Sequence, residues 1–529
     1  MIKDIIKKVF KEYWIIIVTV FLVSITGGVS YATFVYNDSS DRVSEMYVSK
    51  LDYDISIYGD TILQSVCSAD LCSARFEGSD FFINITSNED VPTYYKLIYD
   101  SGYGYSFKFS NGYDAPSGII SGGETKIIKL IVDSGYNQGE IKFKINGGFI
   151  NNNLEDIDVD DNYSETYTMV YATLFETMQG DNEIFADNVN STYVKNSTPG
   201  INFAAIGSDT NGKGLYYTSD LTKTEDFDGD GTGERVYYYR GNVENNNLAF
   251  AGYCWKIIRS NEDGSIRLRY SGVYDDTNKC LSVTSIGTAP FNYTYGDSTY
   301  LGYMVGIDNQ CTSEYCKTTT NSTSYNQAHS NTYNSTVKSF IDSWYENNIL
   351  TQGNTITSKI ANTIYCNDRK IAGEDEGFSD SYYKQLGYGT EGTVFSPNPR
   401  LKTNNNPQFK CEQQNDEFTL SVSAGGTNGY GNNKLTYPVA LLTADEVMFA
   451  GNVFDKENEN NFLHFSSRYW TMSVSHELGG EDIMYVDSIK SLGYGPSNAY
   501  IDLFPVLSLR TDVLVTGGSG LSDDPYIIE

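Results

Sequence analysis

A long apolar segment near the N-terminus constrains this chain more than any other feature of its sequence. Residues 14–36, WIIIVTVFLVSITGGVSYATFVY, contain no charged residue and no proline. A helix of this length can cross a bilayer once. Four lysines and only two acidic residues precede it. This excess of positive charge predicts a cytoplasmic tail at residues 1–13, a transmembrane anchor at residues 14–36, and an exported remainder.

A cleaved secretory signal is the alternative interpretation of the same segment. Its most apolar part ends near Ile25, and Ser30 and Ala32 are small residues at the minus-three and minus-one positions of a cleavage site. Both interpretations export the chain. It is then either a single-pass membrane protein with its bulk outside the cell or a secreted protein.

The composition excludes two classes of partner. The net charge is −31, and no basic patch interrupts the acidic surface that this charge predicts. Nucleic acids and anionic lipid headgroups both require such a patch, so neither is expected. With 529 residues, 40% of them hydrophobic, the chain is long and apolar enough to bury the cores of two or three domains. We therefore expect folded domains that bind cations or neutral ligands.

Eight cysteines in an exported chain are expected to form disulfides, because the extracellular medium is oxidising and no CxxC pair is present. Proximity in sequence predicts the pairs Cys67–Cys72, Cys254–Cys280, Cys311–Cys316 and Cys366–Cys411. The three histidines, His329, His464 and His476, are not at ligand spacing from any cysteine, so a zinc site is not expected.

Apolar residues alternate with polar ones through the segment that follows the apolar span. Strands are predicted around residues 51–57, 83–85, 95–99, 105–109, 126–132 and 141–145, separated by turns rich in Gly, Asn, Asp and Ser. This pattern predicts an immunoglobulin-like β-sandwich over residues 44–150 that acts as a spacer. The layout of an apolar span, the junction YATFVYND and such a sandwich resembles camelysin and TasA-type bacterial matrix proteins over residues 25–150.

Residues 151–165 are acidic, and their apolar residues show no helical or strand periodicity. This segment is therefore predicted to be a linker. The second domain then covers residues 166–529. It is predicted to open with a helix within residues 166–188 and to contain another at residues 334–348, with Val337, Phe340, Ile341 and Trp344 on one stripe. Trp255–Arg259 and Ile266–Tyr270 flank Asp263-Gly264, which predicts a hairpin. The fold class is therefore mainly β, with an α+β C-terminal part.

Several motifs of the second domain resemble one family when they are taken in order. They are the hairpin, TIYCNDR at 363–369, LTADE at 442–446, YWTMS at 469–473, and FPVLSL at 504–509 followed by TGG at 516–518. Together they resemble an uncharacterised domain of Gram-positive bacterial surface proteins that is related to the C-type lectin-like fold. The resemblance implies a fold and a location, and it implies no particular activity.

An aspartate-rich segment is the candidate cation site. Its carboxylate and hydroxyl groups follow the D-x-D-x-D-G spacing, in which the side-chain oxygens of alternate residues can bind one calcium ion. The predicted ligands are Asp226, Asp228, Asp230, Thr232 and Glu234. Tyr237 stands where an EF-hand has its bidentate glutamate, and no helix is predicted on either side. A solvated hairpin tip is therefore the alternative.

A second candidate site follows the YWTMS motif. Aromatic and polar residues suited to stacking on a sugar ring and to hydrogen bonding with hydroxyls are Tyr485, Asp487, Tyr494, Asn498 and Asp502. The triplets EPN and WND of calcium-dependent lectins are absent. Trp470, which lies in an alternating strand, is predicted to be a core residue.

The sequence contains no nucleophile elbow, phosphate loop or HExxH motif, so no catalytic residue is predicted. We expect an adhesin or other binding protein of the cell surface that recognises a glycan or a host or matrix protein. A surface hydrolase stays open, since the two carboxylates of a glycosidase meet only in the fold. A structural component of a biofilm matrix is the third interpretation.

Overall fold

A computed structural model describes residues 51–59, 61–68, 71–132, 138–149, 163–182, 184–187, 201–207, 212–227, 231–308, 311, 313, 316–317, 324–373, 388, 393–477, 481–488 and 491–528. The chain divides into two compact units, Met1–Phe107 with Pro116–Tyr167, and Lys108–Ala115 with Thr168–Glu529. Within these described ranges, no helix is long and apolar enough to cross a membrane. The predicted anchor and most of the predicted linker lie outside the described residues.

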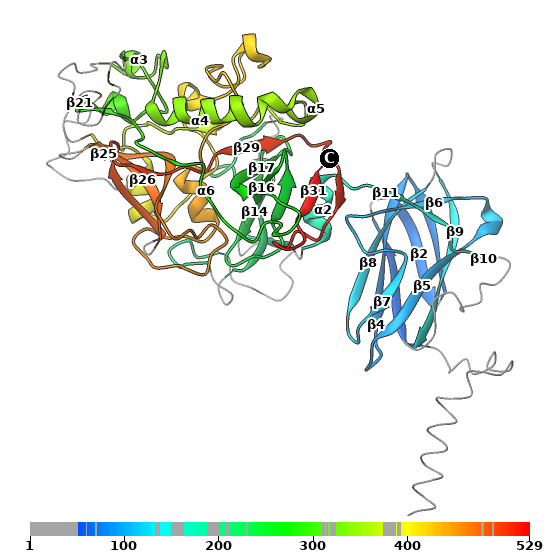
Figure 1. The fold of residues 1–529 in the computed structure, drawn as a ribbon. Coiled ribbons are helices and arrows are strands. Elements are labelled where there is room, and N and C mark those ends of the chain that lie inside the picture. Colours follow the sequence, from blue (N-terminus) through cyan, green and yellow to red (C-terminus); the bar gives the residue numbers. More distant parts are fainter. Residues whose placement is uncertain are drawn as a thin grey trace, which may run out of the picture. The chain divides into compact units, whose positions relative to one another are not determined.

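The first unit consists of two β-sheets (Figure 1). One has the order β1 (Tyr53–Tyr58), β4 (Asp80–Ser87) and β8 (Thr125–Val132), and it continues through β6 (Phe107–Ser110) and β11 (Tyr167–Val170), each of which begins at the last residue of a first-unit segment. The other has the order β10 (Tyr163–Ser164), β5 (Thr93–Asp100), β9 (Gln138–Phe149), β3 (Leu71–Glu77) and β2 (Ile62–Ser68), with β7 (Ser117–Ile120) paired to β5.

Aromatic side chains join the two sheets of the first unit face to face. Phe81 of β4 packs edge-on against Phe143 of β9, with 5.7 Å between the ring centroids. Strand β1 alternates buried and exposed residues along its whole length, as the period-two pattern predicts. The predicted mainly β fold, with more than one sheet, is confirmed. The prediction missed the β2–β3 hairpin, in which Cys67 pairs with Cys72 across the strands.

The second unit is built on a nine-stranded and a five-stranded sheet. The larger contains β12 (Ile184–Ala186), β13 (Gly214–Thr218), β14 (Val236–Arg240), β16 (Tyr253–Ser260), β15 (Asn247–Phe250), β31 (Tyr526–Ile528) and β30 (Val515–Gly517), with β17 (Ile266–Val273) between β16 and β29 (Val506–Leu509). The smaller has the order β18 (Thr288–Ala289), β28 (Ile501–Asp502), β25 (Tyr469–Glu477), β26 (Glu481–Asp487) and β27 (Ser491–Pro496).

Short strand pairs and helices complete the second unit. The pairs are β19 (Thr294–Tyr295) with β21 (Cys316–Lys317), β20 (Met304–Val305) with β22 (Tyr333–Asn334), and β23 (Tyr365–Cys366) with β24 (Glu417–Phe418). The α-helices are α2 (Leu174–Gly180), α3 (Tyr325–Ala328), α4 (Thr336–Asn348), α5 (Asn354–Thr357) and α6 (Ala444–Phe449). Helix α4 confirms the helix predicted at residues 334–348. The helix predicted within residues 166–188 is α2, which is shorter than predicted and lies between β11 and β12 in the sequence.

The β16–β17 hairpin, which the sequence predicts, divides its residues between two faces. Cross-strand partners share a face, so Trp255 and Tyr270 lie on one side. There the ring of Trp344 from α4 packs 5.4 Å from Tyr270. The other face carries cations in the two facing pairs Lys256–Arg269 and Arg259–Arg267.

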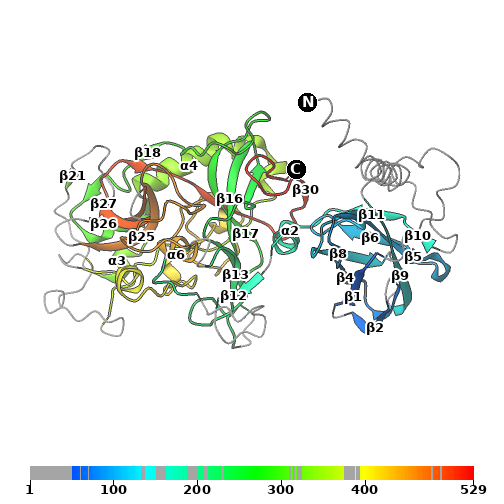
Figure 2. The same cartoon turned by 90° about the horizontal axis from the view of Figure 1, so that it is seen from below.

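Helix α6 packs against this cationic face. Glu446 accepts from Arg259 Nε at 2.9 Å and from Arg267 Nη1 at 3.1 Å, and it is buried with both arginines. At the other end of the helix, Arg240 Nη1 donates to the carbonyls of Met448 and Phe449. The helix contacts both β14 and the β25–β26 sheet. Figures 1 and 2 show it between the larger and the smaller sheet. Charge therefore fixes α6 between the two sheets.

All four predicted disulfides are present: Cys67–Cys72, Cys254–Cys280, Cys311–Cys316 and Cys366–Cys411. Among the described cysteines none is free. Four disulfides are typical of an extracellular or secreted protein, because such bonds persist in oxidising compartments.

Replacing Glu446 with glutamine should destabilise the second unit strongly. The change leaves the buried Arg259 and Arg267 without their shared carboxylate, and breaking a buried ion pair costs about 3–5 kcal/mol. Urea unfolding followed by the fluorescence of Trp255, Trp344 and Trp470 measures the loss. The control is Glu412→Gln at an exposed position, where we expect a change within about 0.5 kcal/mol. Equal effects of the two variants would contradict the role given to Glu446.

Candidate functional site

Two surface loops of the second unit, which are distant in sequence, meet at an aromatic pair. The ring of Phe227, in the aspartate-rich loop, packs edge-on against Tyr430, in the loop at residues 421–433, with 6.1 Å between centroids. Phe227 is 44% exposed, and Tyr430 is half-buried. An exposed aromatic pair offers a surface for stacking against a ligand. We call Phe227 and Tyr430 the aromatic platform.

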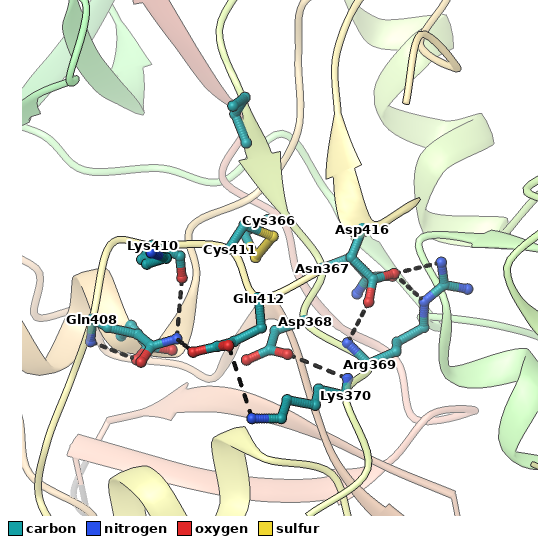
Figure 3. The surroundings of a disulfide bond; sticks show 12 residues. Cys366, Asn367, Asp368, Arg369, Lys370, Gln408, Lys410, Cys411, Glu412 and Asp416 are labelled. Atoms are coloured by element: carbon teal, nitrogen blue, oxygen red, sulfur yellow. Dashed lines mark hydrogen bonds and ion pairs between the residues drawn. A yellow bond between two sulfur atoms is a disulfide. The ribbon is translucent and has the colours of Figure 1, made fainter. Parts of the chain in front are cut away.

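The aspartate-rich loop is fixed at its base. The Glu234 amide donates to the Glu225 carbonyl at 2.8 Å, and the Gly231 amide donates to Asp226 Oδ2 at 3.0 Å. The carboxylate of Glu225 in turn accepts from the Cys411 amide at 3.1 Å. The base of the loop is thus tied to the segment that carries the Cys366–Cys411 disulfide, whose surroundings are shown in Figure 3.

The loop at residues 421–433 is held by its own polar groups. Asn433 Nδ2 donates to the carbonyls of Leu420 and Thr427, and Asn433 Oδ1 accepts from the Gly429 amide at 3.1 Å. Thr419 Oγ1 donates to the Tyr430 carbonyl at 2.5 Å. Because these contacts order the loop before any ligand arrives, binding costs less conformational entropy.

Carboxylates surround the aromatic platform. Burial raises the pKa of the Tyr430 phenol, and the nearby Asp263 and Glu262 raise it further. Burial, followed by the charges of Glu225 and Asp416, raises the pKa of Glu417 to about 7. Carboxylates that repel one another beside exposed aromatic rings favour a cationic or hydrogen-bond-donating ligand.

A small cavity of the second unit lies beside Glu225 and the Cys366–Cys411 disulfide. Its lining includes Glu225, Glu262, Arg259, Arg267 and Glu446, together with the disulfide residues Cys366 and Cys411. Its volume of about 20 Å³ admits a single water molecule. The cavity is too small for a substrate or for an organic ligand.

The structure describes only three of the five residues that are predicted to bind calcium. Asp228 and Asp230 lie outside the described residues, whereas Asp226, Thr232 and Glu234 lie within them. In the described part of the chain, no group of three or more acidic, histidine or cysteine side chains is placed to hold a metal ion. Calcium at this loop stays a prediction.

The five residues of the predicted ligand site do not form one cluster. Tyr485 and Asp487 lie together around Arg468, whose guanidinium covers the Tyr485 ring at 5.0 Å and donates to Asp487 Oδ2 at 2.7 Å. Tyr485 faces Gly493, and a Cβ at Gly493 would lie 3.1 Å from its ring. With Arg468 above it, this ring is less accessible than a sugar platform requires.

The other residues of that set lie elsewhere on the smaller sheet. Tyr494 pairs with Met484, so it lies on the opposite face from Tyr485, where Lys402 donates to its hydroxyl at 3.4 Å. Asp502 accepts from Ser285. Asn498 is half-buried and follows β27. Trp470 is a core residue as predicted, 1% exposed, and its Nε1 donates to the Ala289 carbonyl.

The charged residues of the TIYCNDR and LTADE segments are buried structural groups. Arg369 donates to Asp416 at 2.7 Å, and Figure 3 shows the two side chains facing each other. Arg400 bridges Asp368 and Asp445, at 2.7 Å and 2.9 Å. The motifs therefore stabilise the fold and contribute no side chain to the platform.

One arrangement resembles a hydrolase triad. Ser475 Oγ lies 2.8 Å from His476 Nδ1, and His476 Nε2 lies 3.5 Å from Asp482. Ser475 is 0% exposed and accepts from Asn398 Nδ2. Burial, assisted by Lys402, lowers the pKa of His476 to about 4. A substrate cannot reach the serine hydroxyl, so this arrangement does not support hydrolysis.

Replacing Glu417 with glutamine should reduce the pH dependence of stability. The folded pKa of Glu417 is raised to about 7 from 4.5, so the folded state retains this proton while the unfolded state loses it. The stability from this group is complete below pH 4.5 and falls as the pH rises to 7. Unfolding temperatures between pH 4 and pH 8 measure the effect, with Glu412→Gln as control. A variant that loses stability as steeply as the native chain would contradict this assignment.

A comparison of the sequence with protein-family models found no match, and a comparison with curated proteins also found none.

Proposed function

We propose that this chain is a binding protein of the cell surface, anchored by residues 14–36, whose second unit recognises an extracellular ligand through the aromatic platform. In this proposal the first unit is an immunoglobulin-like spacer and the second has a lectin-like fold. The ligand is a glycan or a host or matrix component that presents hydroxyl and amino groups. The observation that carries the proposal is the contact between the exposed Phe227 and Tyr430.

The chemistry of the platform supports such a ligand. A sugar ring can stack on Phe227, and an amino group can lie between the ring faces and the carboxylates of Glu262, Asp263 and Glu417. The net charge of −31 opposes anionic ligands. One surface site buries little area, so we expect weak single-site affinity and avidity from many copies on one cell.

Replacing Phe227 with alanine should weaken binding without unfolding the protein. We expect an affinity loss of about fivefold to 150-fold, since stacked aromatic groups contribute about 1–3 kcal/mol. The exported chain is screened against a glycan and matrix-protein array that pairs each amino sugar with its N-acetylated form, and product analysis follows each hit. Phe340→Ala is the matched control, because Phe340 is also exposed, at 37%, and lies on α4.

The outcomes separate the interpretations. Preference for the free amine, lost in Phe227→Ala and retained in Phe340→Ala, supports the proposal. Turnover of a hit favours the surface hydrolase. An array without hits favours a structural matrix component, and equal binding by both variants excludes the platform as the site.

Calcium binding at the aspartate-rich loop is tested by calorimetry with calcium alone. We expect binding by the native chain and its loss in Asp228→Ala, because the D-x-D-x-D-G spacing directs alternate oxygens to one ion. Asp276→Ala, at a solvent-exposed aspartate in another turn, is the control. The same heat from native chain and Asp228→Ala would identify the loop as a hairpin tip.

A further inference from the structure

One lysine of helix α4 is enclosed in the interior of the second unit. Lys338 is 0% exposed, and it is the one lysine among the buried residues that the structure describes. It lies in the first turn of α4, where the helix dipole opposes a positive charge. The Tyr303 ring is 5.8 Å from its Nζ, near the limit at which a ring attracts a cation. A lysine is rarely buried in this way unless another group binds its amine.

A single carboxyl group binds both this amine and a side-chain amide. Asp342 Oδ2 accepts from Lys338 Nζ at 2.5 Å and from Asn334 Nδ2 at 3.4 Å. The other oxygen, Asp342 Oδ1, is buried and has no hydrogen-bond partner among the described residues. Asn334 ends the short strand β22, four residues before Lys338. The amine and the amide therefore meet at one carboxyl group, within a short segment of chain.

The surroundings of this carboxyl group favour its protonated form. Burial raises the pKa of Asp342, and although the Lys338 amine opposes this shift, the charge of Glu346 adds to it. A buried ion pair loses the hydration of both its charges. Transfer of one proton from Lys338 to Asp342 is therefore less unfavourable here than in water. The product of this transfer is a neutral amine, which is a nucleophile.

We propose that Lys338 and Asn334 become joined by an amide bond between their side chains, with Asp342 as the group that moves the protons. Nζ attacks Cγ of Asn334, the Cγ–Nζ bond forms, the Cγ–Nδ2 bond breaks, and ammonia leaves. Asp342 takes a proton from Nζ on one oxygen and gives one to Nδ2 from the other, so it ends as it began. No group is oxidised or reduced, so the reaction needs no second reactant.

The bond would connect β22 covalently to the first turn of α4. Asn334 is half-buried, so ammonia that leaves its side chain can reach solvent. The three residues are distant in sequence from Phe227 and Tyr430. The proposal therefore does not depend on the aromatic platform or on the proposed function.

Peptide mapping of the full chain, unfolded before digestion, tests the bond. Trypsin cleaves after a lysine only when its amine is free, so an unjoined chain gives residues 318–338 and 339–359 as two peptides. We expect a single peptide of residues 318–359, lighter than its sequence by about 17 Da, the mass of ammonia. Two peptides of unaltered mass would overturn the proposal.

A succinimide at Asn334 is the competing product, because attack by the Ser335 amide also releases ammonia. It leaves the Lys338 amine free, so trypsin still cleaves there and the loss of mass stays within the peptide of residues 318–338. This result would also rule out the bond.

Three variants assign the roles of the side chains. Asn334→Ala should lose the joined peptide because the attacked carbonyl is absent. Asp342→Asn should lose it because an amide cannot exchange these protons. Asn347→Ala, at an exposed asparagine of the same helix, should retain it. A joined peptide in Asp342→Asn would contradict the role of Asp342. If that variant does not fold, the native chain and Asn334→Ala decide whether the bond exists.

Discussion

The second unit depends on the attachment of α6 to the cationic face of the β16–β17 hairpin. Glu446 at the start of this short helix binds two buried arginines, and Arg240 binds the carbonyls at its end. A six-residue helix has little stability of its own. Pairing of these buried charges supplies the orientation that helix length does not, and the helix contacts strands of both sheets.

Much of the fold could be predicted because it follows local periodicity. Alternation predicts β1, the Asp263-Gly264 turn predicts the β16–β17 hairpin, and a helical stripe predicts α4. The four disulfides followed from proximity in sequence. Strand β2 was missed because four of its successive residues, 63–66, are exposed, so no alternation marks it. The predicted helix was longer than α2 because apolar residues continue into β11 and β12 on either side of it.

The candidate site was less predictable because it depends on contacts between distant segments. Phe227 was visible only as an apolar residue among aspartates, and nothing local indicates its contact with Tyr430. The sequence signal that could have indicated this site is an aromatic residue within an acidic turn. The set around Tyr485 was chosen by residue type, and the pleat places Tyr494 on the other face. Residue type alone could not distinguish a ligand-binding tyrosine from one covered by Arg468.

The Cys366–Cys411 disulfide makes the structure around the Phe227 loop sensitive to the redox state of its compartment. The amide of Cys411 holds Glu225, and Glu225 holds the base of the loop that presents Phe227. In a reducing cytoplasm the disulfide does not persist, so the segment of Cys411 that holds Glu225 would lack its covalent link to Cys366. Oxidation outside the cytoplasm is then the last covalent step in the assembly of this part of the second unit.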